Sequence, residues 1–131
     1  MIGIVVVAHV PLATALAECA RHVLGSELDI YAFDVIPNQC AVDCANEFAQ
    51  KIRAADRGEG VLVLTDLPGA SPSNIAVAAS HAMQAEGVPC CVLGGVNASM
   101  LIKAINYRNG SLEDVATNAL AGAKQALLRV D

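Results

Sequence analysis

The segment VVVAHVPLATALAECA, residues 5–20, decides the fold because it passes from a buried strand into an amphipathic helix within a few residues. The aliphatic run Ile2–Ala8 is typical of a parallel strand that is covered on both faces. From Leu12 onward the apolar residues recur with helical spacing, and Gly25 follows them, where a helix is expected to end. His9 stands at the junction, so the first question is whether it is a packed core histidine or a reactive one.

The rest of the chain repeats this alternation of strand and helix. Further strands are expected at residues 28–35, 60–65 and 88–93, and further helices at residues 42–52, 71–86, 98–105 and 112–128. The third and fourth strands are apolar throughout and are expected to be covered on both faces, whereas the alternating pattern of the second predicts an edge strand. The pattern predicts an α/β domain with a parallel sheet, right-handed crossovers and helices on both faces. The simplest doubly wound order for four strands is the flavodoxin-like 2-1-3-4.

The composition indicates one domain over residues 1–131, because domains typically have about 100–200 residues. Hydrophobic residues make up 55% of the chain and aromatic residues only 3%, so we expect a core built from Ala, Val, Leu and Ile. The net charge is −5, and the Lys and Arg residues are scattered without a basic run. This distribution argues against a nucleic-acid partner.

The cysteines and the N-terminal residues predict a cytoplasmic protein. The five cysteines are an odd number and form no Cys-x-x-Cys pair, which favours reduced thiols over a disulfide framework. The N-terminal apolar run lacks a positively charged start and is interrupted by His9 and Pro11, so we expect neither a signal peptide nor insertion into a membrane. The glycine motifs of nucleotide-binding loops are absent, and we expect no cofactor and no metal.

The predicted topology brings two polar segments to the same edge of the sheet. His9 follows the first strand and Asp66 follows the third, and these strands are neighbours in the order 2-1-3-4. Ligands of open α/β sheets bind beyond the carboxyl ends of the strands, at the point where the winding reverses. We therefore expect His9 and Asp66 to meet in one crevice.

An imidazole beside a carboxylate has a defined chemical use. A hydrogen bond from Nδ1 of His9 to Asp66 would fix the tautomer, leave Nε2 as a nucleophile, and stabilise positive charge on the ring during attack. In the segment DLPGASPSN, Gly69 permits an unusual turn, while Ser71 as N-cap and Pro72 at the first helical position predict a helix start. Amides at a helix start bind phosphate and similar anions. The combination favours phosphoryl transfer to and from His9.

Three motifs in this order carry a family resemblance: an N-terminal strand that ends in His9, the segment VLVLTDLPGASPSN, and the segment GGVNASML. Over residues 1–123 the chain resembles the IIA component of the mannose family of the bacterial phosphoenolpyruvate-dependent sugar phosphotransferase system. The resemblance implies that the phosphocarrier protein HPr phosphorylates His9 on Nε2 and that a IIB protein receives the phosphoryl group. It further implies that Asp66 orients His9, that Ser71 and the backbone of Gly69, Ala70 and Ser71 hold phosphate oxygens, and that the protein is a homodimer.

The chain departs from this family in three respects. Members usually carry Gly after the active histidine, and Val10 here predicts that the loop lies in an ordinary backbone region or has a different shape. Residues 112–128 read as helix rather than as the terminal strand that some members exchange across their dimer, so we expect the dimer to be held by packed, Ala-rich helix faces. No IIB domain follows in this sequence, so the acceptor is expected to be a separate molecule or to be absent.

Three other functions are compatible with parts of the sequence. A regulatory protein could use the same phosphorylatable His9 as a sensor, without a sugar acceptor. The phosphotransfer subunit of the dihydroxyacetone kinase system shares this type of domain. A flavin or nucleotide binder on a flavodoxin-like sheet is disfavoured, because the loops offer no aromatic side chain to stack on a ring.

Several other residues have ordinary structural interpretations. His22 and His81 are expected on polar helix faces, either solvated or at a subunit contact, and Cys90 and Cys91 on opposite faces of a strand. Cys40, Asp43 and Cys44 have helical spacing that could present ligands to a metal, but packing near a helix start is the favoured interpretation. The segment Gly94–Met100 forms either a wall of the crevice or only a tight turn.

Overall fold

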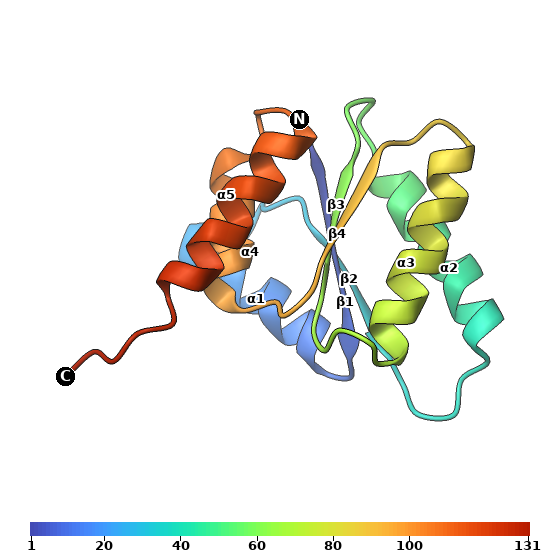
Figure 1. Ribbon diagram of the computed structural model, residues 1–131, viewed down its shortest axis with the longest axis horizontal. Coiled ribbons are helices and arrows are strands. Elements are labelled where there is room, and N and C mark those ends of the chain that lie inside the picture. The colour runs from blue at the N-terminus through green and yellow to red at the C-terminus, as the bar shows by residue number, and fades with distance from the viewer.

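The computed structural model describes all 131 residues, and its central feature is a four-stranded parallel sheet between two layers of helices (Figure 1). In chain order the elements are β1 (Gly3–His9), α1 (Leu12–Leu24), β2 (Tyr31–Val35), α2 (Ala41–Ala55), β3 (Val61–Thr65), α3 (Ser71–Ala85), β4 (Cys90–Leu93), α4 (Ala98–Tyr107) and α5 (Leu112–Gln125). No helix has the length and apolar character needed to cross a membrane.

The strand order is β2-β1-β3-β4, which confirms the predicted flavodoxin-like topology. All three strand pairs are parallel, and the register aligns His9 with Val35 and Val7 with Thr65. The carboxyl ends of β1 and β3 are therefore adjacent, and the residues that follow them share one edge of the sheet.

The two faces of the sheet are covered by different helices. In Figure 1, α1, α4 and α5 lie on one side of the strands and α2 and α3 on the other. Alternate residues of β1 enter the two cores: Ile4 packs on the first side and Val5 on the second. Cys91 packs on the first side and Cys90 on the second, as predicted. Small residues let the layers approach closely, because a Cβ built on Gly3 would lie 2.2 Å from the carbonyl oxygen of Ala55.

The structure refines one sequence-based expectation and corrects another. β4 packs against α3 on one face and α5 on the other, as expected, but it is the outer strand beside β3, so its four residues are only half-buried. The last helix ends at Gln125 rather than at residue 128. Leu127 and Leu128 are exposed, so no packing surface stabilises another helical turn, and the terminal residues leave the body of the molecule (Figure 1).

A buried arginine closes the edge of the sheet opposite to the carboxyl ends. Arg108 donates one hydrogen bond from Nε to the carbonyl of Ile2 at 3.1 Å and another from its guanidinium to the carbonyl of Asp29 at 2.8 Å. The amide of Ile2 donates back to the carbonyl of Arg108 at 2.8 Å. Burial lowers the pKa of Arg108. The Arg108 guanidinium thus joins the residue before β1 to the segment before β2 by hydrogen bonds. It lies at the opposite end of β1 from His9.

Candidate active site

His9 and Asp66 meet at the carboxyl edge of the sheet. His9 is the last residue of β1, and Asp66 directly follows β3. Nδ1 of His9 lies 2.7 Å from Oδ2 of Asp66, and the backbone amide of His9 donates to the same oxygen at 2.9 Å. The side chain of His9 is 49% exposed, whereas that of Asp66 is only 8% exposed. The carboxylate is therefore part of the protein interior, while the ring reaches solvent.

The surroundings of Asp66 keep it ionised. Burial by itself would raise the pKa of Asp66, but hydrogen bonds from the amide and ring of His9 and from the amide of Leu67, together with the charge of His9, lower it below its usual value. The Leu67 amide donates to Oδ1 at 2.8 Å. Because an ionised carboxylate only accepts hydrogen bonds, Nδ1 of His9 must carry the proton. In the neutral form of this ring, Nε2 holds a free lone pair, as a nucleophile requires.

The ring of His9 borders two pockets. One has a volume of about 320 Å³ and is shared with Ser71, Cys44 and the connection between β2 and α2. The other lies on the far side of the ring and is lined by Leu12, Asp66, Leu67, Gly95 and Val96. Apart from His9 and Asp66, the side chains that line these pockets are apolar or uncharged.

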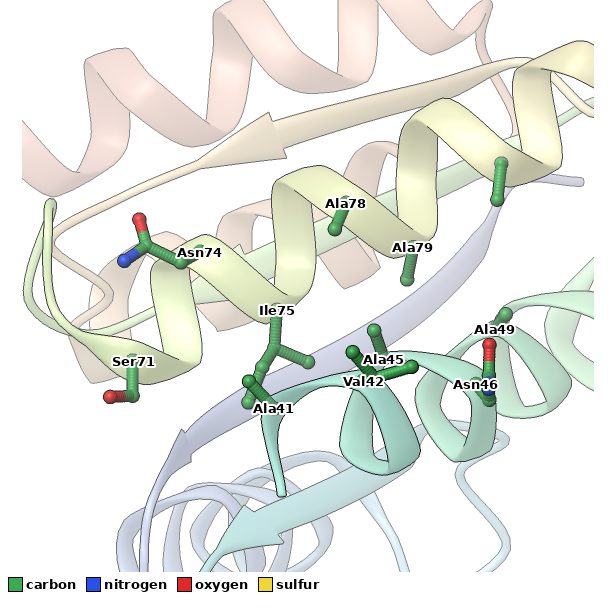
Figure 2. Close-up of a pocket in the computed structure, with 11 residues that line it drawn as sticks. Ala41, Val42, Ala45, Asn46, Ala49, Ser71, Asn74, Ile75, Ala78 and Ala79 are labelled. Carbon is green, nitrogen blue, oxygen red and sulfur yellow. The ribbon is translucent and has the colours of Figure 1, made fainter. Parts of the chain in front are cut away.

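The start of α3 differs from the expected capping arrangement. The N-cap is Ala70, in extended conformation, and Ser71 is already the first helical residue, so Pro72 occupies the second position rather than the first. Ala70 has no side chain that could cap, and the helix start carries no side-chain cap. The hydroxyl of Ser71 points away from the helix (Figure 2). It is thus available to a ligand in the pocket that Ser71 shares with His9.

The backbone amides before α3 are only partly used inside the protein. The amide of Ala70 donates to the carbonyl of Leu67 at 3.0 Å and is therefore engaged within the loop. The amides of Gly69 and Ser71 have no backbone acceptor. Gly69 has a φ of +88°, which accounts for a glycine at this turn. The phosphate-binding role of Gly69, Ala70 and Ser71 stays a prediction, and the amides of Gly69 and Ser71 are the free ones.

The segment after β4 is both a turn and a wall of the site. Gly95 and Val96 line the pocket on the Asp66 side of His9. Asn97 caps α4, because its side chain accepts a hydrogen bond from the amide of Met100 at 2.8 Å. Of the two alternatives for Gly94–Met100, the structure therefore supports a wall of the site over a turn alone.

Val10 occupies an ordinary backbone region, because Asn38 is the only residue other than glycine with a positive φ. The amide of Val10 donates to the carbonyl of Val35 at 3.1 Å and so continues the contact between β1 and β2. Val10 therefore has no positive φ, as expected for a β-branched residue, and the Val10–Pro11 peptide bond that follows it is cis.

Sequence reasoning missed the connection between β2 and α2. Ile36, Pro37, Asn38 and Gln39 line the pocket that His9 shares with Ser71. They carry no catalytic motif, but their position just past the end of β2 could have been read as a site position, because loops at this edge bind ligands.

The other cysteines and histidines considered in the sequence do not form a second catalytic site. Cys44 is buried and its thiol donates to Oε1 of Gln39 at 2.9 Å, while Cys40 is the exposed N-cap of α2. Burial is the main cause of a raised pKa at Cys44. No group of three or more His, Cys, Asp or Glu side chains is placed to hold a metal ion. His22 and His81 are exposed on α1 and α3.

Fold and site together define a flavodoxin-like domain with a histidine–aspartate pair at the switch point of its sheet. A family model described as the fructose IIA component of the phosphotransferase system (EIIA-man) matches residues 3–120. The chain belongs to this EIIA-man family.

Several solved structures have the same fold. The phosphotransferase component EIIA from Streptococcus agalactiae superposes with a TM-score of 0.84 at 23% identity, covering 98% of this chain and 97% of that one. The mannose/sorbose specific IIA subunit from Enterococcus faecalis gives a TM-score of 0.84 at 20% identity, covering 99% of this chain and 95% of that one. A sigma-54 interaction domain protein from Enterococcus faecalis gives 0.79 at 16% identity, covering 96% and 93%.

One relative is a transcriptional regulatory protein. The transcriptional regulatory protein LevR of Bacillus subtilis (strain 168) is 30% identical over 118 residues, which cover 87% of this chain. The chain spans only 12% of the length of that protein.

Proposed function

We propose that this chain is a phosphoryl carrier, in which His9 accepts a phosphoryl group from phosphorylated HPr and passes it to a IIB protein during sugar uptake. The observation that carries the proposal is the 2.7 Å contact between Nδ1 of His9 and the buried carboxylate of Asp66, in a histidine whose side chain is 49% exposed. The proposal includes a single mannose-type IIA domain over residues 1–131 that is cytoplasmic and homodimeric.

The proposed reaction requires only groups that the chain and its partner supply. The Nε2 lone pair of His9 attacks the phosphorus of the donor's phosphohistidine, and the N–P bond of the donor breaks as the new N–P bond forms. The electron pair of the broken bond returns to the donor ring. Asp66 stabilises the positive charge that develops on the ring of His9, while the hydroxyl of Ser71 and the amides of Gly69 and Ser71 hold phosphoryl oxygens. Transfer to IIB is the same step in reverse.

The direct test is phosphorylation of the purified protein. Incubation with phosphoenolpyruvate, the first enzyme of the system and HPr should increase the intact mass by one phosphoryl group, and brief acid treatment should remove it, because phosphohistidine is acid-labile. Ring ¹⁵N chemical shifts should place the modification on Nε2. Absence of any mass increase, or an acid-stable modification, would contradict the proposal.

An apolar groove beside the site supports a protein as the phosphoryl partner. The groove has a volume of about 510 Å³ and lies between α2 and α3, where Val42 and Ala45 face Ile75 and Ala79 (Figure 2). It continues into the pocket of His9, because Ala41, Ser71 and Ile75 line both. No charged side chain lines the groove. We propose that HPr or IIB packs apolar side chains into it and brings a cation of its own to the phosphoryl group.

A charge in this groove should block transfer from the protein donor. Ala78 lines the groove, whereas its exposed neighbour Val77 does not, so Ala78→Glu and Val77→Glu form a matched pair on one helix. We expect Ala78→Glu to slow labelling by phosphorylated HPr at least tenfold, equivalent to about 1.4 kcal/mol, because the carboxylate loses solvation on docking. Val77→Glu should be labelled at the wild-type rate.

Phosphoramidate, a small phosphoryl donor that needs no docking surface, separates docking from chemistry. Both variants should react with it as the wild type does. Equal labelling of Ala78→Glu and Val77→Glu by phosphorylated HPr would show that the groove is not the docking surface.

A second candidate function is regulation of transcription by the phosphorylation state of His9. The observation that favours it is the 30% identity with the transcriptional regulatory protein LevR. The two functions differ in the fate of the phosphoryl group. A carrier loses it rapidly to a purified IIB protein, whereas a sensor keeps it in the presence of IIB and changes its affinity for a regulatory target.

A further inference from the structure

Gly94, the first residue after β4, lies so close to Pro68 that no side chain fits at its position. A Cβ at this position would lie 2.8 Å from Cγ of Pro68, closer than a real Cβ approaches a neighbouring atom. Its backbone is not in the left-handed region, so any residue could adopt its conformation. The next residue, Gly95, is the opposite case, because its φ is +73° and a Cβ there would meet nothing within 4 Å.

The contact between Gly94 and Pro68 joins two segments that are also tied by their backbones. The amide of Gly95 donates to the carbonyl of Asp66 at 2.7 Å, and the amide of Val96 donates to the carbonyl of Thr65 at 2.9 Å. Pro68 lies two residues after Asp66, in the same turn. The turn that carries Asp66 is therefore held against the end of β4 by two hydrogen bonds and one close packing contact.

The position of this turn determines the geometry of the histidine–aspartate pair. Oδ2 of Asp66 receives both the ring and the backbone amide of His9, at 2.7 Å and 2.9 Å. A displacement of the Asp66 backbone by a few tenths of an ångström would lengthen or bend both hydrogen bonds. His9 is the last residue of the buried strand β1, and this strand cannot move together with the turn. A displacement of the turn would therefore change the distance between His9 and Asp66.

We infer that Gly94 is a positioning residue of the site: its missing side chain lets Pro68 seat against the end of β4 and thereby fixes Asp66 relative to His9. The inference rests on the proposed function for its effect on phosphoryl transfer. The effect on the tautomer of His9 is independent of that function. A methyl group at position 94 must push Pro68 outward or move the segment 94–96 away from Asp66.

Four variants test the inference: Gly94→Ala, Pro68→Ala, the double variant, and Gly110→Ala as control. Gly110 also lacks a positive φ, but a Cβ there would lie at an ordinary 3.4 Å from the carbonyl oxygen of Tyr107, and it precedes α5 at the amino edge of the sheet. The readouts are the rate of labelling by phosphoramidate, the ring ¹⁵N shifts of His9 that report the proton on Nδ1, and the melting temperature.

The expected pattern is a loss followed by a rescue. Gly94→Ala should label roughly 10- to 100-fold more slowly, because misplacement of a catalytic group by about 1 Å can cost this much. It should also show a reduced population of the Nδ1–H tautomer. The double variant should recover most of both losses, because alanine at position 68 removes Cγ, while the Cβ of residue 68 lies at an ordinary 3.6 Å. Gly110→Ala should match the wild type.

Two results would overturn the inference. One is a Gly94→Ala protein with wild-type labelling and unchanged ¹⁵N shifts. The other is a double variant no better than the single one, which would make the loss a general disturbance of the fold. If the wild type itself is not labelled, the proposed function fails, and the tautomer measurement still decides whether Gly94 positions the pair.

Discussion

Replacement of His9 by alanine is expected to abolish labelling by phosphorylated HPr while the protein remains folded. The side chain is 49% exposed, and its hydrogen-bond partner is the carboxylate of Asp66. Alanine keeps the backbone amide that donates to Asp66, so the carboxylate retains two of its three hydrogen bonds. The variant therefore loses the nucleophile without leaving Asp66 unpaired. Intact mass after incubation with the phosphoryl donor measures the result, and circular dichroism confirms the fold.

The other two histidines are the matched controls for this experiment. His22 and His81 are exposed and lie on helices, away from the carboxyl edge. His22→Ala and His81→Ala should be labelled at the wild-type rate. If His9→Ala still accepts one phosphoryl group and one of the two controls does not, His9 is not the phosphorylated residue.

Replacement of Asp66 by asparagine should slow phosphorylation by roughly two to four orders of magnitude, the range over which general acid–base and tautomer-fixing groups contribute. Each carboxylate oxygen accepts at least one N–H: Oδ2 takes the ring and amide of His9, and Oδ1 takes the amide of Leu67. An asparagine NH₂ group in either position would face an N–H donor. At least one hydrogen bond is lost in each orientation, and the charge that stabilises the imidazolium disappears.

The measurement is the single-turnover rate of labelling, with Asp43→Asn on the exposed start of α2 as the control. Asp66→Asn should also lower the free energy of unfolding by about 1–3 kcal/mol, because a buried donor is left without its acceptor. A labelling rate within a factor of about two of the wild type would rule out the orienting role of Asp66.

The Asp66→Asn variant should also differ from the wild type in how its stability depends on pH. The pKa of Asp66 is lower in the folded protein than its ordinary value, so the folded state favours the ionised form. The stability from this carboxylate is complete above the unfolded pKa of about 4 and is lost as the pH falls through the lower folded pKa. Between about pH 7 and pH 3, the free energy of unfolding should fall less for Asp66→Asn than for the wild type. An identical acid loss would indicate that Asp66 is not ionised against His9.

The fold could be read from the sequence because its main signals are strong. Ile2–Ala8 is a long aliphatic run that only a strand buried on both faces explains, and the helices after it repeat their apolar spacing. The errors occur where neighbours decide the outcome. β4 is only half-buried because it is the outer strand, and α5 ends at Gln125 because Leu127 and Leu128 meet no surface, although their spacing is helical.

The pairing of His9 with Asp66 could be predicted because topology alone brings the ends of β1 and β3 together. The details of the turn that follows could not. The helix starts at Ser71 instead of after it, and the engagement of the Ala70 amide depends on backbone angles that no side chain dictates. The contact of Gly94 with Pro68 could not be predicted either, because it depends on how two distant segments pack in the folded protein. Two adjacent glycines in a sequence indicate only a turn.

Neither pocket at His9 is lined by a lysine or an arginine, and this has an energetic consequence for the proposed carrier. A phosphoryl group on the ring would sit near a carboxylate, balanced by amide dipoles instead of by a resident lysine or arginine. Such a bond keeps a high transfer potential, since no fixed counter-ion lowers the energy of the loaded state. The group would then leave as readily as it arrives, and the direction of flow would depend on which partner is charged and present.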